Sequence, residues 1–258
     1  LTKRYTEEAI SFIKQNRNKP FFLYYPNNFP HVPLFASDDF KGRSKRGIYG
    51  DVVEELDWSV GRILETLKQL NLDQNTLVIF TSDNGPWIRE KQEGGSSGLF
   101  FEGKGSTYEG GMRVPAIAWW PGMIQPHQTS TALVTTMDIF PTVLKLANAP
   151  VPESTVLDGT DLLPLLKGGK TSVRDEIFYY TRNKLYAVRK GPWKALFITR
   201  RSYSKEPAVE HSVPLLFNVE IDPSEKYDLS AEYPGVISEI MKARDAHQAT
   251  LEPVISHL

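Results

Sequence analysis

The feature that most constrains this chain is a short apolar run that ends directly in polar residues. Residues 77–80 read Leu-Val-Ile-Phe, and residues 81–85 continue as Thr-Ser-Asp-Asn-Gly. Such a run, rich in β-branched and aromatic residues, is typical of a strand buried on both faces of a parallel sheet. Open α/β sheets bind their ligands just beyond the carboxyl ends of such strands. There Asp83 and Asn84 offer a carboxylate and an amide oxygen, the hard donors that Ca²⁺ or Mg²⁺ prefers.

A second polar segment, residues 103–111, follows about twenty residues later, a spacing compatible with one α/β unit. It places Lys104 between two glycines, so that a backbone and an ammonium group can approach an anion closely. Metal ligands in one loop and a lysine in the next predict a site for a tetrahedral oxyanion ester. A lone lysine is, however, usually a solvated surface charge.

The pair Asn84-Gly85 also has a simpler interpretation, because it is a strong signal for a tight hairpin turn. A hairpin should be followed by a returning strand of alternating polarity. The polar, glycine-rich stretch at residues 89–98 does not have that pattern. The two segments taken together therefore favour a site over a simple turn.

His31 lies in a proline-rich loop, residues 26–33, directly after the apolar run at residues 21–25. We interpret that run as a buried strand, which puts His31 at a strand end. An imidazole there suits proton transfer or anion binding. The alternative is a histidine that only packs within its loop.

Strand and helix patterns alternate in the first part of the chain and predict an α/β fold. We expect residues 1–170 to form the C-terminal part of an α/β domain, with part of a mixed, mostly parallel sheet flanked by helices. We expect residues 171–258 to form a smaller subdomain of antiparallel sheet plus helix. The expected strands are residues 21–25, 77–80, 114–121, 177–180, 185–189, 194–198 and 215–219, and the main expected helices are residues 51–70, 137–147 and 236–251.

Composition excludes several classes of protein. The net charge of −1 gives no reason to expect a nucleic-acid partner. No apolar run approaches the roughly 18 residues of a membrane helix, so no membrane span is expected. The chain contains no cysteine, which excludes disulfides, zinc thiolates and a cysteine nucleophile within it.

Taken in order, these segments closely resemble type I sulfatases of the arylsulfatase A class, in the alkaline phosphatase superfamily. The resemblance extends over essentially the whole chain. It rests on residues 20–33, 80–85, 103–115, 157–159, 186–189, 216–218 and 227–229. It implies a sulfuric ester hydrolase in which Asp83 and Asn84 bind Ca²⁺, in preference to Mg²⁺. Lys104 and His31 would contact the sulfate group and assist departure of the alcohol. The implied substrate is a sulfated carbohydrate or an aryl sulfate.

The chain departs from the family in one respect. Sulfatases carry, in an N-terminal portion, paired Asp metal ligands and a Cys- or Ser-based motif that matures to formylglycine, and this chain has no such segment. We therefore expect a C-terminal portion that lacks the nucleophile, is inactive alone and binds Ca²⁺ poorly or not at all. A missing N-terminal half, or another chain, is expected to complete the sheet. The resemblance also implies a periplasmic or secreted location, although no signal is visible.

Two other functions remain open at this point. One is a non-catalytic, sulfatase-like binding module. The other is a phosphatase or phosphonate hydrolase of the same superfamily, which usually lines its metals with several histidines; only five occur here. Substrate contacts are also open, because Trp87, Arg89 and Lys91 could line the mouth of the site or form an exposed loop.

Overall fold

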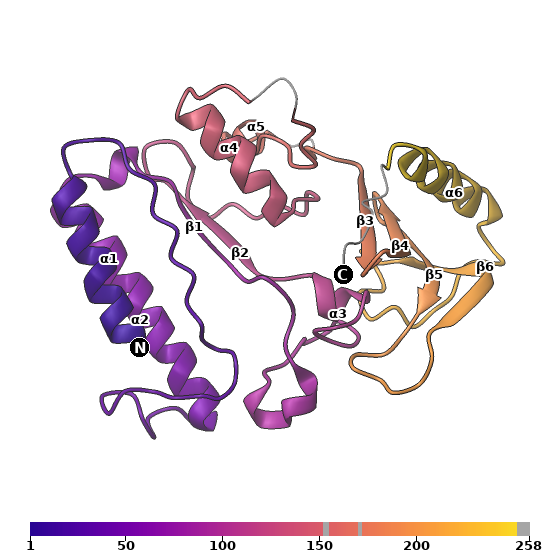
Figure 1. The fold of residues 1–258 in the computed structure, drawn as a ribbon, viewed down its shortest axis with the longest axis horizontal. Coiled ribbons are helices and arrows are strands. Elements are labelled where there is room, and N and C mark those ends of the chain that lie inside the picture. The colour runs from indigo at the N-terminus through magenta and orange to yellow at the C-terminus, as the bar shows by residue number, and fades with distance from the viewer. Residues whose placement is uncertain (152–154, 170–171, 252–258) are drawn as a thin grey trace, which may run out of the picture. The chain divides into compact units, whose positions relative to one another are not determined.

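The computed structural model describes residues 1–151, 155–169 and 172–251 (Figure 1). The chain folds into two compact units that interleave along the sequence. Unit 1 comprises Leu1–Ser82, Pro86–Ser96 and Pro115–Gln128, and unit 2 comprises Asp83–Gly85, Ser97–Val114 and Thr129–Leu258. We describe each unit by itself. The predicted division of the chain at residue 170 stays a prediction.

Unit 1 is built on two helices, α1 (Thr2–Asn16) and α2 (Gly47–Gln69), which pack on one another. The buried residues of α1 recur every three or four positions and so form one stripe. Part of this helix contact is polar, since Thr6 Oγ1 lies 2.7 Å from Ser59 Oγ. The helix predicted at residues 51–70 is confirmed, with its start four residues earlier.

The strand predicted at residues 21–25 is wrong. These residues belong to no strand of the described structure. Phe22 and Tyr24 are 63% and 76% exposed, while Tyr25 turns inward and its hydroxyl lies 3.0 Å from Ser59 Oγ. The apolar content favours a strand, but a strand also needs a hydrogen-bonded neighbour, and none of the described segments pairs with this one.

The strand behind Asp83 is present as β1 (Val78–Thr81), but its predicted environment is wrong. It pairs antiparallel with β2 (Ala116–Trp119), not in parallel, and among the described residues this sheet has two strands. The strand is not buried on both faces, because Phe80 and its register partner Ile117 are 41% and 61% exposed. An apolar run indicates a strand, whereas the direction of its neighbour depends on the connection between them.

Unit 2 contains an antiparallel four-stranded sheet in the order β3–β4–β5–β6. Its strands are β3 (Glu176–Thr181), β4 (Lys184–Lys190), β5 (Trp193–Thr199) and β6 (Val209–Asn218). The helix α6 (Pro234–Ala249) packs on it through Ile237 and Ile240, and Val188 and Leu216 are fully buried beneath. The predicted antiparallel sheet plus helix is confirmed, and with it the α/β class.

The remaining helices of unit 2 are short: α3 (Glu109–Met112), α4 (Ile139–Leu146) and α5 (Leu163–Leu166). Asp138 directly precedes α4 and holds two neighbouring backbone segments in place. Its buried carboxylate accepts hydrogen bonds from the backbone N–H groups of Thr135 and Thr160, both at 2.7 Å, and it pairs with Arg174. In the part of the chain that the structure describes, no helix has the length and apolar character needed to cross a membrane.

Candidate active site

The predicted metal-ligand segment is fixed by its contact with α3. Gly85 N donates a hydrogen bond to Gly111 O at 3.0 Å. A Cβ added at Gly85 would lie only 1.8 Å from Gly110 O, so a side chain there would force the two backbones apart. The segment Asp83–Gly85 is therefore held against this helix.

The lysine loop packs against the same helix. Gly110 N donates to Phe101 O at 2.9 Å. A Cβ at Gly111 would lie 2.3 Å from Ser106 O and 2.6 Å from Gly103 O, so the backbone of the loop passes directly over the helix. Because α3 supports both this loop and Gly85, it joins the two segments that the sequence singled out.

The backbone of the lysine loop is also held by residues that follow β5. Ser202 Oγ donates to Lys104 O, and Ser202 N donates to Glu102 Oε2 at 3.1 Å. Arg201 Nε lies 2.5 Å from the other oxygen of Glu102, whose side chain is buried. Lys104 itself is half-buried. The loop is thus attached to the C-terminal sheet on one side and to α3 on the other.

The chemistry of the donors at residues 83–84 fits a hard cation, although the set is incomplete. Asp83 is exposed and Asn84 is half-buried, and they contribute one carboxylate and one amide group. Ca²⁺ takes six to eight oxygen ligands. No group of three or more His, Cys, Asp or Glu side chains suited to a metal occurs among the described residues. Further ligands would have to come from elsewhere.

His31 lies in unit 1, on an exposed loop. Its Nδ1 is 2.7 Å from Val32 O. Since a carbonyl only accepts, Nδ1 carries the proton and Nε2 is left to exchange protons with a ligand. The ring lies 5.5 Å from that of Trp87, at an angle of 42°. Asp83, Asn84 and Lys104 thus lie in two segments of unit 2 that both pack on α3. The predicted convergence of these side chains, and of His31 with them, stays a prediction.

Sequence reasoning missed a buried cluster of charges beside α3. Lys194, on β5, is fully buried and lies 3.0 Å from Glu109 Oε1 and 2.9 Å from Glu225 Oε1. Arg189 Nη1 is 3.4 Å from the other oxygen of Glu109. The ammonium also lies 4.7 Å from the centre of the Tyr179 ring. The available signal is the position of Lys194 within the strand Trp-Lys-Ala-Leu-Phe-Ile-Thr, where a single lysine interrupts an apolar run.

Burial and the neighbouring charges act against one another on the pKa values of this cluster. Burial works to lower the pKa of Lys194, but the carboxylates of Glu109 and Glu225 outweigh it and raise that pKa. Burial works to raise the pKa of Glu109, but Lys194 and Arg189 outweigh it and lower that pKa. For Glu225 burial prevails over Lys194, and its pKa is raised. Burial also raises the pKa of Tyr179 to about 12.

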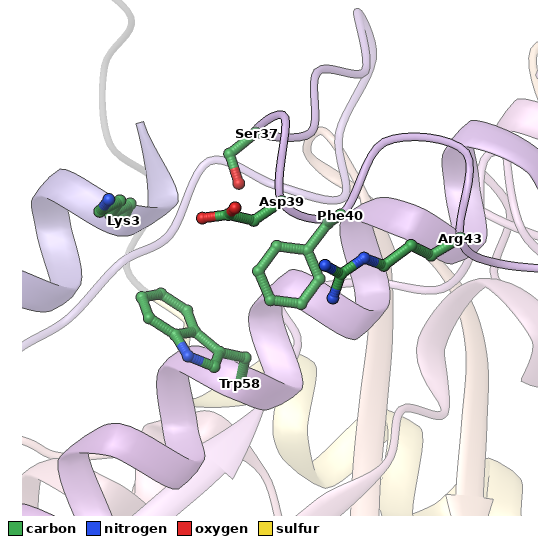
Figure 2. A pocket seen from close by; sticks show the side chains of 6 residues that line it. All are labelled: Lys3, Ser37, Asp39, Phe40, Arg43 and Trp58. Carbon is green, nitrogen blue, oxygen red and sulfur yellow. The ribbon is translucent and has the colours of Figure 1, made fainter.

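A separate hollow of about 270 Å³ lies in unit 1. It is lined by Lys3, Ser37, Asp39, Phe40, Arg43 and Trp58 (Figure 2). The Phe40 and Trp58 rings lie 5.8 Å apart, and the Arg43 guanidinium is 5.7 Å from the centre of the Phe40 ring. Among the described residues, those that line it do not include the four predicted site residues. The hollow therefore lends no support to the predicted site.

Comparison with known families gives two matches along the chain. The family model described as Sulfatase matches residues 1–149, and that described as the C-terminal region of aryl-sulfatase matches residues 172–258. N-acetylgalactosamine-6-sulfatase of Canis lupus familiaris is 42% identical, over 98% of this chain and 53% of its own length. Steryl-sulfatase of Homo sapiens is 41% identical, over 98% of this chain and 49% of its own. The chain spans about half the length of the curated relatives it matches.

Solved structures agree with these matches. The crystal structure of the PsFucS1 sulfatase from Pseudoalteromonas sp. superposes with a TM-score of 0.90 at 30% identity, over 95% of this chain and 52% of that chain. A structure from work on the metabolism of multiple glycosaminoglycans by Bacteroides thetaiotaomicron has a TM-score of 0.82 at 34% identity, over 96% of this chain and 54% of that chain.

Proposed function

The chain belongs to the sulfatase family, and we propose that it forms the C-terminal part of a sulfuric ester hydrolase acting on a sulfated sugar or an aryl sulfate. The observation that carries this proposal is the common support of two loops by α3. Gly85 and the backbone around Lys104 both pack on this helix. An ammonium group and two metal-type oxygens on one support suit the charge that develops on a sulfuryl group.

In this proposal each predicted residue has a distinct task. Asp83 and Asn84 supply two of the oxygen ligands of a Ca²⁺ ion. When bound, that ion would supply positive charge to the sulfate oxygens. Lys104 donates hydrogen bonds to the same group and offsets its negative charge. His31 keeps its Nδ1–H on Val32 O, so in the doubly protonated imidazolium form it is the Nε2–H that would give a proton to the leaving alcohol oxygen.

The remaining parts of the site are proposed to lie outside this chain. The chain has neither a cysteine nor a Ser-based motif from which a formylglycine could form, so we place the nucleophile, with further metal ligands, in an N-terminal half. The exposed apolar side chains Phe22, Tyr24, Phe80 and Ile117 of unit 1 suit contact with such a partner. A periplasmic or secreted location belongs to the same proposal. The names of the curated relatives support the reaction class, since each is a sulfatase.

The test is turnover by the full-length protein. We expect release of inorganic sulfate from an aryl sulfate or a sulfated monosaccharide, measured by ion chromatography. Lys104→Ala should lower kcat by about 10²- to 10³-fold, the usual effect of removing one donor to a developing oxyanion. Asp83→Ala should abolish turnover and reduce the calcium content. Asp38→Ala, which removes an exposed carboxylate from another loop, is the matched control and should leave kcat unchanged.

Other outcomes would favour the alternatives. Faster turnover of the corresponding phosphate ester would indicate a phosphatase of the same superfamily. Binding of sulfated sugars without turnover would indicate a non-catalytic module. Full activity of Asp83→Ala with normal metal content would contradict the assignment of this residue as a ligand.

A further inference from the structure

The most deeply buried cationic side chain in the described structure is Lys194, and the proposed reaction does not use it. It has no exposed surface, and its two carboxylate neighbours are almost as deeply buried. Removing three charged groups from water is costly unless they satisfy one another. An ion pair of this kind is weak evidence for a stabilising role, because an apolar packing of similar volume is often as stable.

The cluster ends directly on α3. Glu109 is the first residue of that helix, and its carboxylate lies against Lys194. Glu225 makes two contacts in this cluster. One carboxylate oxygen pairs with Lys194, and the other accepts a hydrogen bond from Glu109 N at 2.7 Å. Both the side chain and the backbone of Glu109 are therefore fixed by charged groups from the C-terminal part of the chain.

From Glu109 the connection to the candidate site is short. Two residues along the helix, Gly111 accepts the hydrogen bond from Gly85 N, which follows Asp83 and Asn84 directly. Gly110 packs on the carbonyl groups of Phe101 and Glu102, at the start of the lysine loop. A helix of only four residues has few internal hydrogen bonds to stabilise it. Its conformation and position therefore depend on its contacts with other segments.

We propose that Lys194 is a positioning residue: through Glu109 and Glu225 it fixes α3, and through α3 it sets the places of the Asp83–Gly85 segment and the Lys104 loop. The proposal rests on the function proposed above for this site. It assigns to the C-terminal sheet a task beyond its own folding. In this proposal the sheet holds α3 in place, and α3 in turn positions the metal ligands Asp83 and Asn84 and the sulfate contact Lys104.

The experiment compares four variants of the full-length protein by hydrogen–deuterium exchange and by steady-state kinetics. Lys194→Met removes the central charge at nearly constant length. Lys184→Met is the matched control, because it breaks an exposed ion pair with Glu210 in the same sheet. Ile240→Ala destabilises the packing of α6 without touching α3. Glu225→Gln removes one charge but keeps an oxygen for Glu109 N–H, and it replaces Lys194→Met if that variant does not fold.

We expect Lys194→Met to raise amide exchange at Gly85 and Gly111 and to lower kcat by about 10- to 100-fold, with a smaller effect on KM, as displaced catalytic groups do. Lys184→Met should leave the exchange rates at Gly85 and Gly111, and kcat, within about twofold of those of the unmodified protein. Ile240→Ala should raise exchange in the C-terminal sheet without a selective rise at Gly85. Unchanged exchange at Gly85 in the folded variant, or a loss of kcat no larger than that of Ile240→Ala, would overturn the proposal.

The two proposals can fail separately. If the unmodified protein releases no sulfate but Lys194→Met still raises exchange selectively at Gly85, the positioning role stands and the proposed function fails. If sulfate is released normally by Lys194→Met, the proposed function stands and the positioning role fails.

Discussion

Buried carboxylates in this protein bind backbone N–H groups of other segments as well as cations. Each accepts a charge-assisted hydrogen bond, which is stronger than a neutral one and fixes a loop without a regular element. The pairs of carboxylate and backbone donor are Asp51 with Gly42 and Ser44, Glu55 with Ser37, Glu102 with Ser202, Asp138 with Thr135 and Thr160, and Glu225 with Glu109. Loss of such a charge should therefore release a loop.

Asp51 provides a pH-dependent case. Hydrogen bonds from the backbone of Gly42 and Ser44, at 2.8 and 2.7 Å, hold the pKa of its carboxyl below its ordinary value. A lowered folded-state pKa contributes stability that is present above the unfolded pKa of about 3.9 and is lost as the pH falls through the folded pKa.

We therefore expect Asp51→Asn to lower the Tm at pH 6 and to have a progressively smaller effect below about pH 4. Thermal melts across pH 3–7, with the exposed Asp57→Asn on the same helix as control, measure this. A Tm difference that is constant across this range would show that the charge of Asp51 contributes nothing.

At this scale the sequence indicates some residues of the candidate site and not others. Asp83, Asn84 and Lys104 can be selected because they stand in loops beside glycines and an apolar run. The role of Lys194 cannot be predicted this way. Its partner Glu109 is 85 residues away, and the contact of Glu225 with Glu109 spans 116 residues. Whether a charge is buried depends on such partners, which only the tertiary structure brings together.

At the scale of elements, the four-residue helix α3 has the most consequence for the candidate site. Its two internal glycines allow backbone segments to approach on two sides, which no side chain would permit. Along the chain, β1 comes shortly before Asp83, and the lysine loop comes directly before α3. The helix is therefore better described as a spacer between two loops than as part of a hydrophobic core.

Two glycine substitutions should have opposite effects on stability. In Gly85→Ala the new Cβ would meet Gly110 O, so we expect a loss of about 1–3 kcal/mol, together with lower kcat. Gly61, inside α2, has open space around it, so Gly61→Ala should stabilise by about 0.5–1 kcal/mol and leave kcat unchanged. Urea unfolding of both variants measures the difference. Equal stability of Gly85→Ala and the unmodified protein would contradict the close approach at α3.

The strand β6 begins at Val209, six residues before its predicted start at residue 215, because its first half mixes polar and apolar residues. The other three strands of the C-terminal sheet could be predicted within a few residues, because each is short, apolar and bounded by turn residues. The segment at residues 21–25 could not. Its sequence fits a strand equally well. Strand pairing, however, depends on two segments, and the sequence of one segment does not identify its partner. The same limit explains why the orientation of β1 was predicted wrongly while its position was predicted correctly.

At the scale of the whole molecule, the chain spans about half the length of the sulfatases named above. Unit 2 carries Asp83, Asn84 and Lys104, and unit 1 carries His31. The central claim is that these four residues serve one sulfate group.

A crystal structure of the full-length protein with calcium and a sulfate ester tests this claim most directly. We expect the oxygens of Asp83 and Asn84 within about 2.3–2.6 Å of the metal. Lys104 Nζ should lie within about 3 Å of a sulfate oxygen, and His31 Nε2 within the same distance of the ester or sulfate oxygens. A sulfate bound elsewhere, or a metal whose ligands exclude Asp83, would contradict the account.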